Sequence, residues 1–243
     1  MFASSTLAKE HELSKIQIKH IDALVAFYRD DLALRSKLEG FDDSLVSLVS
    51  KTPALRSLTH SYRSRPKTVV SLRRKLIKKF ESYSTDGKLN ITPSTLGLRI
   101  NDLIGLRILH LHTNQIEQID AVLKAALADY SFEIREGPIA RTWDDELRRY
   151  YRRVRIQTVA SKNMYTSVHY VVNLNNQKQD LTAEIQVRTL AEELWGEVDH
   201  QLNYPEDHES AACQEQIKVL ARLTSAATRL VDSIFLSDEL SRQ

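Results

Sequence analysis

The spacing of hydrophobic positions changes along the chain. Near both ends apolar residues recur every three or four positions, whereas in the middle they alternate with polar residues or form short β-branched runs. The helical spacing predicts helices over residues 7–34, 42–49, 66–80, 116–128, 190–202 and 214–235. The other pattern predicts five strands, over residues 104–112, 132–136, 154–159, 168–174 and 182–188. We therefore expect an α+β protein in which helices at both ends flank a mixed sheet of about five strands.

The length of 243 residues fits one domain with helical additions better than two full domains. We expect an N-terminal helical region over residues 1–58, a core over 59–205 and a C-terminal helical extension over 206–243. The first residues lack the apolar run of a signal peptide, and no run of about 18 apolar residues is present. A cytoplasmic protein without a membrane partner is therefore expected.

Two scarce residue types narrow the chemistry. The single cysteine, Cys213, cannot form an internal disulfide or supply a four-ligand zinc site, which favours a reducing compartment. None of the six glycines falls into the spacing of a Rossmann turn or a P-loop. If the protein binds nucleotide phosphates, it must use side chains rather than a glycine-rich loop.

The net charge of +2 hides a strong segregation of charge. Residues 63–79 contain eight basic side chains and no acid, and residues 135–155 contain seven arginines against four acids. Residues 184–209 contain eight acids and a single arginine. Separate cationic and anionic surfaces suggest a protein that handles polyphosphate and metal together.

The first candidate cluster is the segment RPKTVVSLRRK. On a helix that begins at Pro66, the side chains of Lys67, Ser71 and Lys75 would line one face at steps of four residues. Ammonium groups and a hydroxyl in such a row suit a chain of phosphates. A solvated basic helix face is the alternative interpretation.

The second cluster is the segment DLIGLRI, which leads into the first predicted strand. Arg107 would project from that strand and could contact a base or a phosphate. Asp102 could bind Mg²⁺, which prefers one or two carboxylates together with substrate phosphates. An exposed salt bridge on a surface strand is the alternative.

The third cluster is the segment MYTSVHYVV. At the two-residue period of a strand, Tyr165, Ser167 and His169 share one face. The tyrosine ring could stack on a base, and the histidine could donate to a phosphate or a ribose. A half-buried strand with its polar side in water would show the same pattern.

The fourth cluster is the segment AEIQVRT. Glu184, Gln186 and Arg188 share one strand face, and such a polar row would be a poor core. Glu184 could bind a metal or accept a proton from an attacking hydroxyl, although a solvated edge strand is the alternative. In the helix that follows, Trp195 is expected in the core, and Asp199 is expected to orient a neighbour.

Taken in order, these motifs resemble the synthetase domain of the RelA/SpoT family. The pattern is RxKxxxSxxxK, DxxGxR, YxSxH, and ExQxRT followed by Trp195 and the pair Asp199 and His200. The resemblance spans residues 64–204, and the length resembles that of the single-domain small alarmone synthetases. Their fold is a nucleotidyltransferase-like α+β core.

The resemblance implies transfer of the β,γ-pyrophosphate of ATP to the 3′-hydroxyl of GTP or GDP, which makes (p)ppGpp in the stringent response. It implies Mg²⁺ bound by Asp102 and Glu184, with Glu184 also the candidate catalytic base. Arg65 and Arg107 would lie on either side of the adenine. The predicted ATP-binding residues are Arg65, Lys67, Ser71, Lys75 and Arg107. The predicted GTP- or GDP-binding residues are Tyr165, His169, Lys162, Arg148, Gln186 and Asn203.

Two departures and several alternatives accompany the resemblance. Met164 stands where the family usually has glycine, and Asp199 where it has glutamate. Some relatives are toxins that pyrophosphorylate the 3′ end of tRNA, and a non-catalytic nucleotide or RNA binder is a third interpretation. RNA binding is not indicated, whereas helix 214–235 offers a face for a homo-oligomer. The chain has no His-Asp dipeptide and no room for an HD-type hydrolase domain, so no alarmone hydrolysis is expected.

Overall fold

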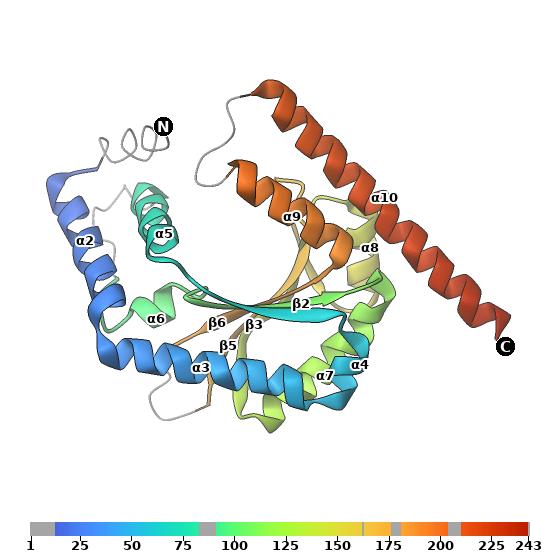
Figure 1. Cartoon of the computed structure of the whole chain (residues 1–243), viewed down its shortest axis with the longest axis horizontal. Coiled ribbons are helices and arrows are strands. Elements are labelled where there is room, and N and C mark those ends of the chain that lie inside the picture. The colour runs from blue at the N-terminus through green and yellow to red at the C-terminus, as the bar shows by residue number, and fades with distance from the viewer. Residues whose placement is uncertain (1–12, 83–90, 162, 176–180, 204–209, 243) are drawn as a thin grey trace.

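The computed structural model describes residues 13–82, 91–161, 163–175, 181–203 and 210–242 (Figure 1). Its described strands are β1 (Ser61–Pro66), β2 (Ile104–His110), β3 (Phe132–Thr142), β4 (Gln157–Ala160), β5 (Ser167–Leu174) and β6 (Ala183–Thr189). Its described helices are α2 (Lys15–Asp30), α3 (Leu32–Lys51), α4 (Pro53–Leu58), α5 (Val69–Ser82), α6 (Leu96–Arg99), the 3-10 turn η1 (Thr113–Gln115), α7 (Ile116–Asp129), α8 (Asp145–Arg153), α9 (Leu190–Asn203) and α10 (Ala211–Ser241).

The strands form one mixed sheet in the order β1-β2-β6-β5-β3-β4. Strand β2 is antiparallel to β1 and parallel to β6, and β5 is antiparallel to both β6 and β3. Helices α3, α4 and α7 cover one side of the sheet, and α9 and α10 lie on the other (Figure 1). The predicted α+β class with flanking helices is confirmed.

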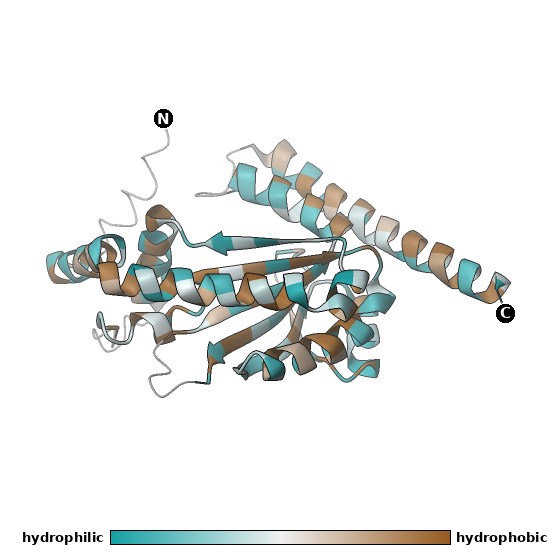
Figure 2. Cartoon of the chain, turned by 60° about the horizontal axis from the view of Figure 1, so that its bottom comes forward, coloured by the Kyte–Doolittle hydropathy of each residue, from teal (hydrophilic) through white to brown (hydrophobic). Residues whose placement is uncertain are grey.

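The sheet has six strands because the segment 61–66, predicted as a connection, forms strand β1. Its sequence is polar and none of its residues is buried, and it lies as a hydrophilic strand at the edge of the sheet (Figure 2). Edge strands tolerate polar residues because only one side of the strand is paired. Pro66, predicted to begin a helix, instead ends this strand, and α5 begins at Val69.

Two further predictions about helices are wrong. The short helix expected over 42–49 is the second half of the continuous helix α3. Gly40 lies within α3 and does not end the helix. Its position is exposed, and a Cβ atom there would meet no other atom within 4 Å. The basic segment 135–162, expected to be a loop with one strand at each end, contains helix α8 and a longer strand β3.

One hydrophobic core joins the sheet to the N-terminal helices. Side chains of α2 and α3, among them Leu24 and Leu48, belong to the same buried cluster as Leu106 of β2 and Ile185 of β6. A smaller cluster, centred on Trp195, packs α9 against Ile217 of α10. Trp195 is therefore a core residue, as expected. The predicted domain boundaries stay a prediction.

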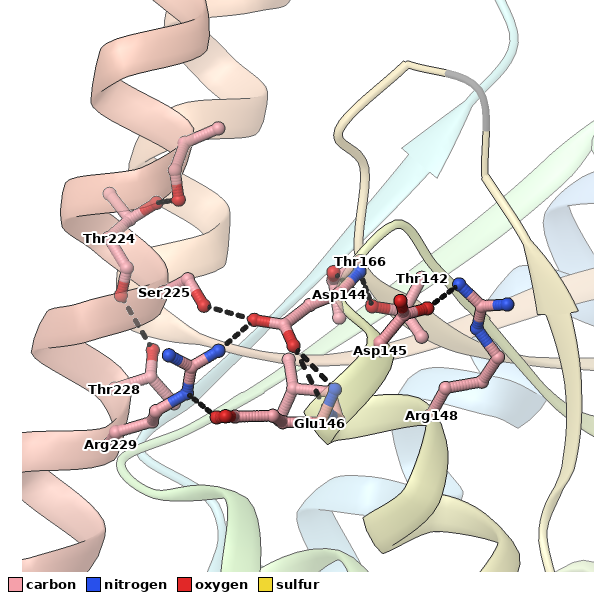
Figure 3. A network of polar contacts seen from close by, with 12 residues as sticks. Thr142, Asp144, Asp145, Glu146, Arg148, Thr166, Thr224, Ser225, Thr228 and Arg229 are labelled. Carbon is pink, nitrogen blue, oxygen red and sulfur yellow. Dashed lines mark hydrogen bonds and ion pairs between the residues drawn. The ribbon is translucent and has the colours of Figure 1, made fainter.

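Helix α10 is attached to the core through a buried carboxylate (Figure 3). Asp144, which is 5% exposed, caps α8 by accepting from the amides of Glu146 and Leu147 at 2.8 and 3.3 Å. Its second oxygen accepts from the Ser225 hydroxyl at 2.7 Å and pairs with the Arg229 guanidinium. One carboxylate therefore holds the start of one helix against the middle of another.

Replacing Asp144 by alanine should lower the free energy of unfolding by about 3 kcal/mol, since the variant loses a helix cap and leaves Ser225 and Arg229 without their buried partner. Urea unfolding measures this change. Asp145→Ala is the matched control, because that carboxylate is 76% exposed, and we expect a loss below about 1 kcal/mol. Equal losses in the two variants would contradict the attachment of α10 through Asp144.

Within the described part of the chain, no helix is long and apolar enough to span a membrane. The outward side of α10 does expose large apolar side chains, namely Val219, Leu223, Leu230 and Ile234. They lie at the steps of one helix face. The predicted homo-oligomer would use this face and stays a prediction.

Candidate functional site

One face of the central sheet is polar. In strands β2 and β6 the side chains of Leu106, Ile108, Ile185 and Val187 are buried in the core. Because side chains alternate along a strand, their neighbours point to the other face. That face carries Gly105 and Arg107 of β2, Glu184, Gln186 and Arg188 of β6, and His169 of β5, with Arg107 and His169 both opposite Gln186.

Two adjoining cavities lie on this face, and Asp102 and Glu184 line both of them. The first cavity, of about 350 Å³, is lined by Arg65, Pro66, Lys67, Thr68, Ser71, Asp102, Gly105, Leu106, Arg107, Glu184, Gln186 and His200. The second cavity, of about 170 Å³, is lined by Lys75, Lys79, Arg99, Asn101, Asp102, Glu136, Arg141, His169, Val171 and Glu184. The two carboxylates therefore mark the boundary between two spaces with cationic walls.

Asp102 receives two ammonium groups, with the Nζ atoms of Lys67 and Lys75 each 2.7 Å from its carboxylate oxygens. The predicted helical row is partly wrong, since Lys67 precedes α5. Its amide donates to the Leu103 carbonyl at 2.9 Å, and its carbonyl accepts from the Tyr28 hydroxyl at 2.6 Å. The two lysines therefore converge on Asp102 from a strand end and a helix.

Glu184 lies between His169 and Gln186. The His169 Nδ1 atom is 2.9 Å from one carboxylate oxygen, and the Gln186 amide donates to the other at 2.8 Å. Burial alone would raise the pKa of Glu184, but His169, Gln186 and the charge of Lys75 outweigh it and lower the pKa to about 2. The carboxylate is therefore ionised at neutral pH.

Tyr165 and His169 extend this contact away from the carboxylate. The Tyr165 hydroxyl is 3.1 Å from His169 Nε2, and their ring centroids are 5.7 Å apart. Since an ionised carboxylate only accepts, His169 donates to Glu184 through Nδ1. Burial raises the pKa of Tyr165, and the Arg188 guanidinium lies 5.9 Å from the centre of its ring. Tyr165, His169 and Glu184 therefore form a chain of contacts in which His169 lies between the other two.

Arg65 and Arg107 line the first cavity and meet carboxylates of α9. Arg107 Nη1 donates to Glu193 at 2.8 Å and also pairs with Glu197. The same Glu197 oxygen lies 4.0 Å from Arg65 Nη1. The sequence predicts these acids only as part of an anionic segment. Their four-residue spacing on a predicted helix is the signal that places both on one helix face.

Among the described residues, three of the predicted acceptor residues line neither cavity, namely Arg148, Asn203 and Tyr165. Arg148 lies on α8 and pairs with Asp145 (Figure 3). Asn203, at the end of α9, donates to Asp199 at 2.9 Å and accepts from Gln214 at 2.7 Å, so it joins α9 to α10. Lys162 lies outside the described residues. Arg148 lies away from the cavities because residues 145–153 form α8, whose Glu146 pairs with Arg229 of α10, and its role at the acceptor stays a prediction.

Other residues of the cavities were not predicted as ligands. Arg99, Arg141 and Lys79 line the second cavity, and His200 lines the first. Arg141 reaches the site because β3 continues through two register shifts to Thr142, where its sequence lacks regular alternation. Gln186 lines the first cavity and donates its amide to Glu184, and its role at the guanine edge stays a prediction.

At the start of α9, next to the site, Glu192 is a buried carboxyl, 7% exposed. Its Oε2 accepts from the Thr189 amide at 2.8 Å, and the Thr189 hydroxyl accepts from the Glu192 amide at 3.2 Å. These reciprocal bonds form a capping box. Burial raises the pKa of Glu192 to about 7 although the Thr189 bonds and Arg188 oppose it.

Because of this raised pKa, the folded state keeps the proton on Glu192 at pH values where the unfolded state has released it. The contribution of Glu192 to stability therefore falls as the pH rises from about 4.5 to about 7. Glu192→Gln keeps an acceptor for the cap but cannot titrate. Relative to wild type, the variant should gain about 3 kcal/mol of unfolding free energy between pH 4.5 and 8. Urea unfolding at the two pH values tests this, and a constant difference between the proteins would contradict it.

The carboxylates of this site fit a magnesium ion whose remaining ligands come from the substrate. Among the described residues no group of three or more His, Cys, Asp or Glu side chains could hold a metal. Two carboxylates, Asp102 and Glu184, do line the same two cavities. Mg²⁺ is commonly bound by one or two carboxylates while phosphates and water complete its shell. The donor set is therefore compatible with Mg²⁺ brought together with a polyphosphate.

Fold and site together define an α+β protein in which the polar face of a mixed sheet carries two cation-lined cavities with two carboxylates at their boundary. The sequence profile described as the region found in RelA / SpoT proteins matches residues 64–209, more than half of the chain. The chain therefore belongs to this family. Comparison with curated protein sequences finds no match.

Solved structures of small alarmone synthetases share the fold. Small alarmone synthetase 1 from Bacillus subtilis, bound to its product pppGpp, superposes with a TM-score of 0.60 at 21% identity, over 88% of this chain and 97% of that one. A GTP pyrophosphokinase family protein from Streptococcus pneumoniae gives 0.56 at 20% identity, over 84% and 96%. The Bacillus subtilis enzyme bound to AMPCPP gives 0.55 at 19% identity, over 88% and 98%. Both proteins are thus matched over nearly their whole length.

Proposed function

We propose that this protein is an ATP-dependent pyrophosphokinase that transfers the β,γ-pyrophosphate of ATP to the 3′-hydroxyl of GTP or GDP. Membership of the RelA/SpoT family supports alarmone synthesis, as does the fold shared with an enzyme whose structures hold pppGpp and AMPCPP. The observation that carries the proposal is the pair Asp102 and Glu184 at the boundary of two adjoining cavities. A donor in one cavity and an acceptor in the other would meet at these carboxylates.

The first cavity is proposed to bind ATP. Its Arg65 and Arg107 offer planar guanidinium groups on which an adenine can stack. Lys67, Ser71 and Lys75 supply donors for the phosphates, since ammonium groups bind phosphate oxygens strongly. Lys67 and Lys75 would exchange part of their contact with Asp102 for the incoming phosphates.

Asp102 and Glu184 are proposed to hold Mg²⁺ with the donor phosphates. When bound, the ion would neutralise the negative charge that develops during transfer. Because the pKa of Glu184 is about 2, its carboxylate need not lose a proton before it binds the ion. The strong hydrogen bonds from His169 and Gln186 fix the direction in which it points.

The second cavity is proposed to bind the acceptor. His169 lines this cavity and would contact the ribose. Tyr165, whose hydroxyl lies 3.1 Å from His169 Nε2, would stack on guanine. The cations Lys79, Arg99 and Arg141 would face its 5′-phosphates. The acceptor O3′ forms a bond to the β-phosphorus of ATP, the bond between that phosphorus and the α,β-bridging oxygen breaks, and AMP leaves.

The proton of the acceptor hydroxyl is proposed to pass to a Glu184 oxygen. A carboxylate with a pKa of about 2 is a weak base, so it can take this proton only late in the reaction. That suits phosphoryl transfer, whose loose transition state depends on positioning and charge more than on early proton removal. Glu184 is therefore proposed to act mainly through its charge.

Purified full-length protein with Mg²⁺ and γ-labelled ATP tests the acceptor, when it is offered GDP, GTP or deacylated tRNA in separate reactions. Label in guanosine tetraphosphate or pentaphosphate supports the proposal. Label in tRNA would support the toxin-type alternative, and no transferred label would support a binding protein. Release of pyrophosphate from added ppGpp with Mn²⁺ would contradict the expected lack of hydrolase activity.

A further inference from the structure

Five charged side chains of alternating sign form a row from buried Arg188 to Arg65, and two of them, Arg107 and Arg65, line the first cavity. Buried Arg188 pairs with Glu193, Glu193 pairs with Arg107, Arg107 pairs with Glu197, and Glu197 approaches Arg65. The arginines come from three adjacent strands, β6, β2 and β1, and both glutamates come from α9. Helix α9 therefore places two carboxylates between the arginines of the sheet.

The inner end of this row is fixed. The Arg188 side chain is only 1% exposed, and it packs against the backbone of α9 at Gly196. A Cβ atom at Gly196 would lie 2.6 Å from Arg188 Nη1, so glycine leaves the space that the guanidinium fills. Glu193, itself 15% exposed, is held by Arg188 on one side and by Arg107 on the other. It has little freedom to leave Arg107.

The outer carboxylate is placed differently. Glu197 is 37% exposed, and a single oxygen of it faces Nη1 of both Arg65 and Arg107. Burial alone would raise the pKa of Glu197, but its hydrogen bond with Arg107 and the charge of Arg107 lower it. An anion thus lies beside two arginines that line the first cavity, and water can reach this anion.

We propose that the two glutamates act in opposite directions on the donor nucleotide. Glu193 is a positioning residue that holds Arg107 in place for the donor base, and Glu197 competes with the donor for Arg65 and Arg107. The inference rests on the proposed function, in which the donor base stacks between these two arginines.

The chemistry of guanidinium supports opposite roles. A carboxylate binds a guanidinium at its edge and leaves its flat face open for stacking, so Glu193 can hold Arg107 while a base is bound. Glu197 instead bridges the two groups between which the base must enter. When only a fraction of the protein is competent to bind, the apparent Kd equals the intrinsic Kd divided by that competent fraction.

Calorimetric titration of the full chain with AMPCPP, an ATP analogue, and Mg²⁺ tests the inference. Glu193→Gln should raise Kd at least about 10-fold, since it removes a charged partner of Arg107. Glu197→Gln, the same substitution one turn further along α9, should lower Kd by about 2- to 5-fold. Glu193→Asp, which keeps the charge, should fall between wild type and Glu193→Gln.

Inorganic tripolyphosphate separates positioning of the base site from general damage. It has no base, so Glu193→Gln should bind it within about 2-fold of wild type while its affinity for AMPCPP falls. A loss for both ligands in Glu193→Gln, unchanged AMPCPP binding in that variant, or weaker AMPCPP binding in Glu197→Gln would each overturn the inference. If Glu193→Gln does not fold, wild-type affinity in Glu193→Asp would overturn it. Absence of AMPCPP binding by wild type would overturn the proposed function itself, and this inference with it.

Discussion

A Glu184→Gln variant is expected to transfer pyrophosphate at least about 1,000-fold more slowly than wild type. The amide has nearly the shape of the carboxylate but carries no charge, so it can neither bind Mg²⁺ well nor stabilise the array of cations around it. In wild type the donors of His169 and Gln186 lie 2.9 and 2.8 Å from two different carboxylate oxygens of Glu184. An amide has only one accepting oxygen, so it cannot replace both of these acceptors. The initial rate of label transfer from γ-labelled ATP to GDP measures the effect.

Glu136 provides the matched control for this variant. Its carboxylate also lines the second cavity, but it is 48% exposed and lies 4.0 Å from its partner Arg141. Glu136→Gln should change the rate by less than about 3-fold. The melting temperature of Glu184→Gln should stay near that of wild type, which would exclude unfolding as the cause. A Glu184→Gln protein that retains a tenth of the wild-type rate would overturn the role of this carboxylate.

An Asp102→Asn variant is expected to lose at least about 100-fold in rate at millimolar Mg²⁺, with part of the loss recovered at higher Mg²⁺. The Nζ atoms of Lys67 and Lys75 each lie 2.7 Å from an oxygen of Asp102. An asparagine at position 102 would leave these two positive charges close together without an anion between them. The lost metal ligand and the altered lysines both weaken donor binding. Rates over a Mg²⁺ titration measure the effect.

Asp22→Asn is the control for the basic helix. Asp22 pairs with Arg73 of α5 but is 55% exposed and lines neither cavity, so neutralising it should leave both the rate and its dependence on Mg²⁺ within about 2-fold. If Asp102→Asn also kept the Mg²⁺ dependence of wild type while losing rate, Asp102 would serve only to orient the lysines. The assignment of Asp102 as a metal ligand would then be wrong.

The polar sheet face was predictable because strand alternation is a local property. Glu184, Gln186 and Arg188 alternate with Ile185 and Val187, so their shared face followed from the sequence alone. Strands β2, β5 and β6 lie within two residues of the predicted ranges for the same reason. Strand β1 was missed because its polar sequence has no apolar period, and only pairing with β2 makes it a strand.

Long-range contacts account for what the sequence could not show. Asp102 meets Lys67 across 35 positions of the chain, and Arg107 meets Glu193 across 86 positions. No local pattern encodes such pairs, and they depend on the order of the strands and the placement of α9. The placement of Arg148 away from the cavities has a different origin, because its basic segment has a helical period and forms α8.

The central claim is transfer of an intact pyrophosphate group, and the nucleotide released from ATP tests it most directly. Full-length protein incubated with Mg²⁺, ATP and GDP should yield AMP and a 3′-pyrophosphorylated guanosine nucleotide in equal amounts, as separated and counted by ion-exchange chromatography with mass spectrometry. Equal amounts are required because each transfer breaks one bond between the α- and β-phosphates of ATP. Formation of ADP in place of AMP, or of AMP with free pyrophosphate and no modified guanosine nucleotide, would contradict the account.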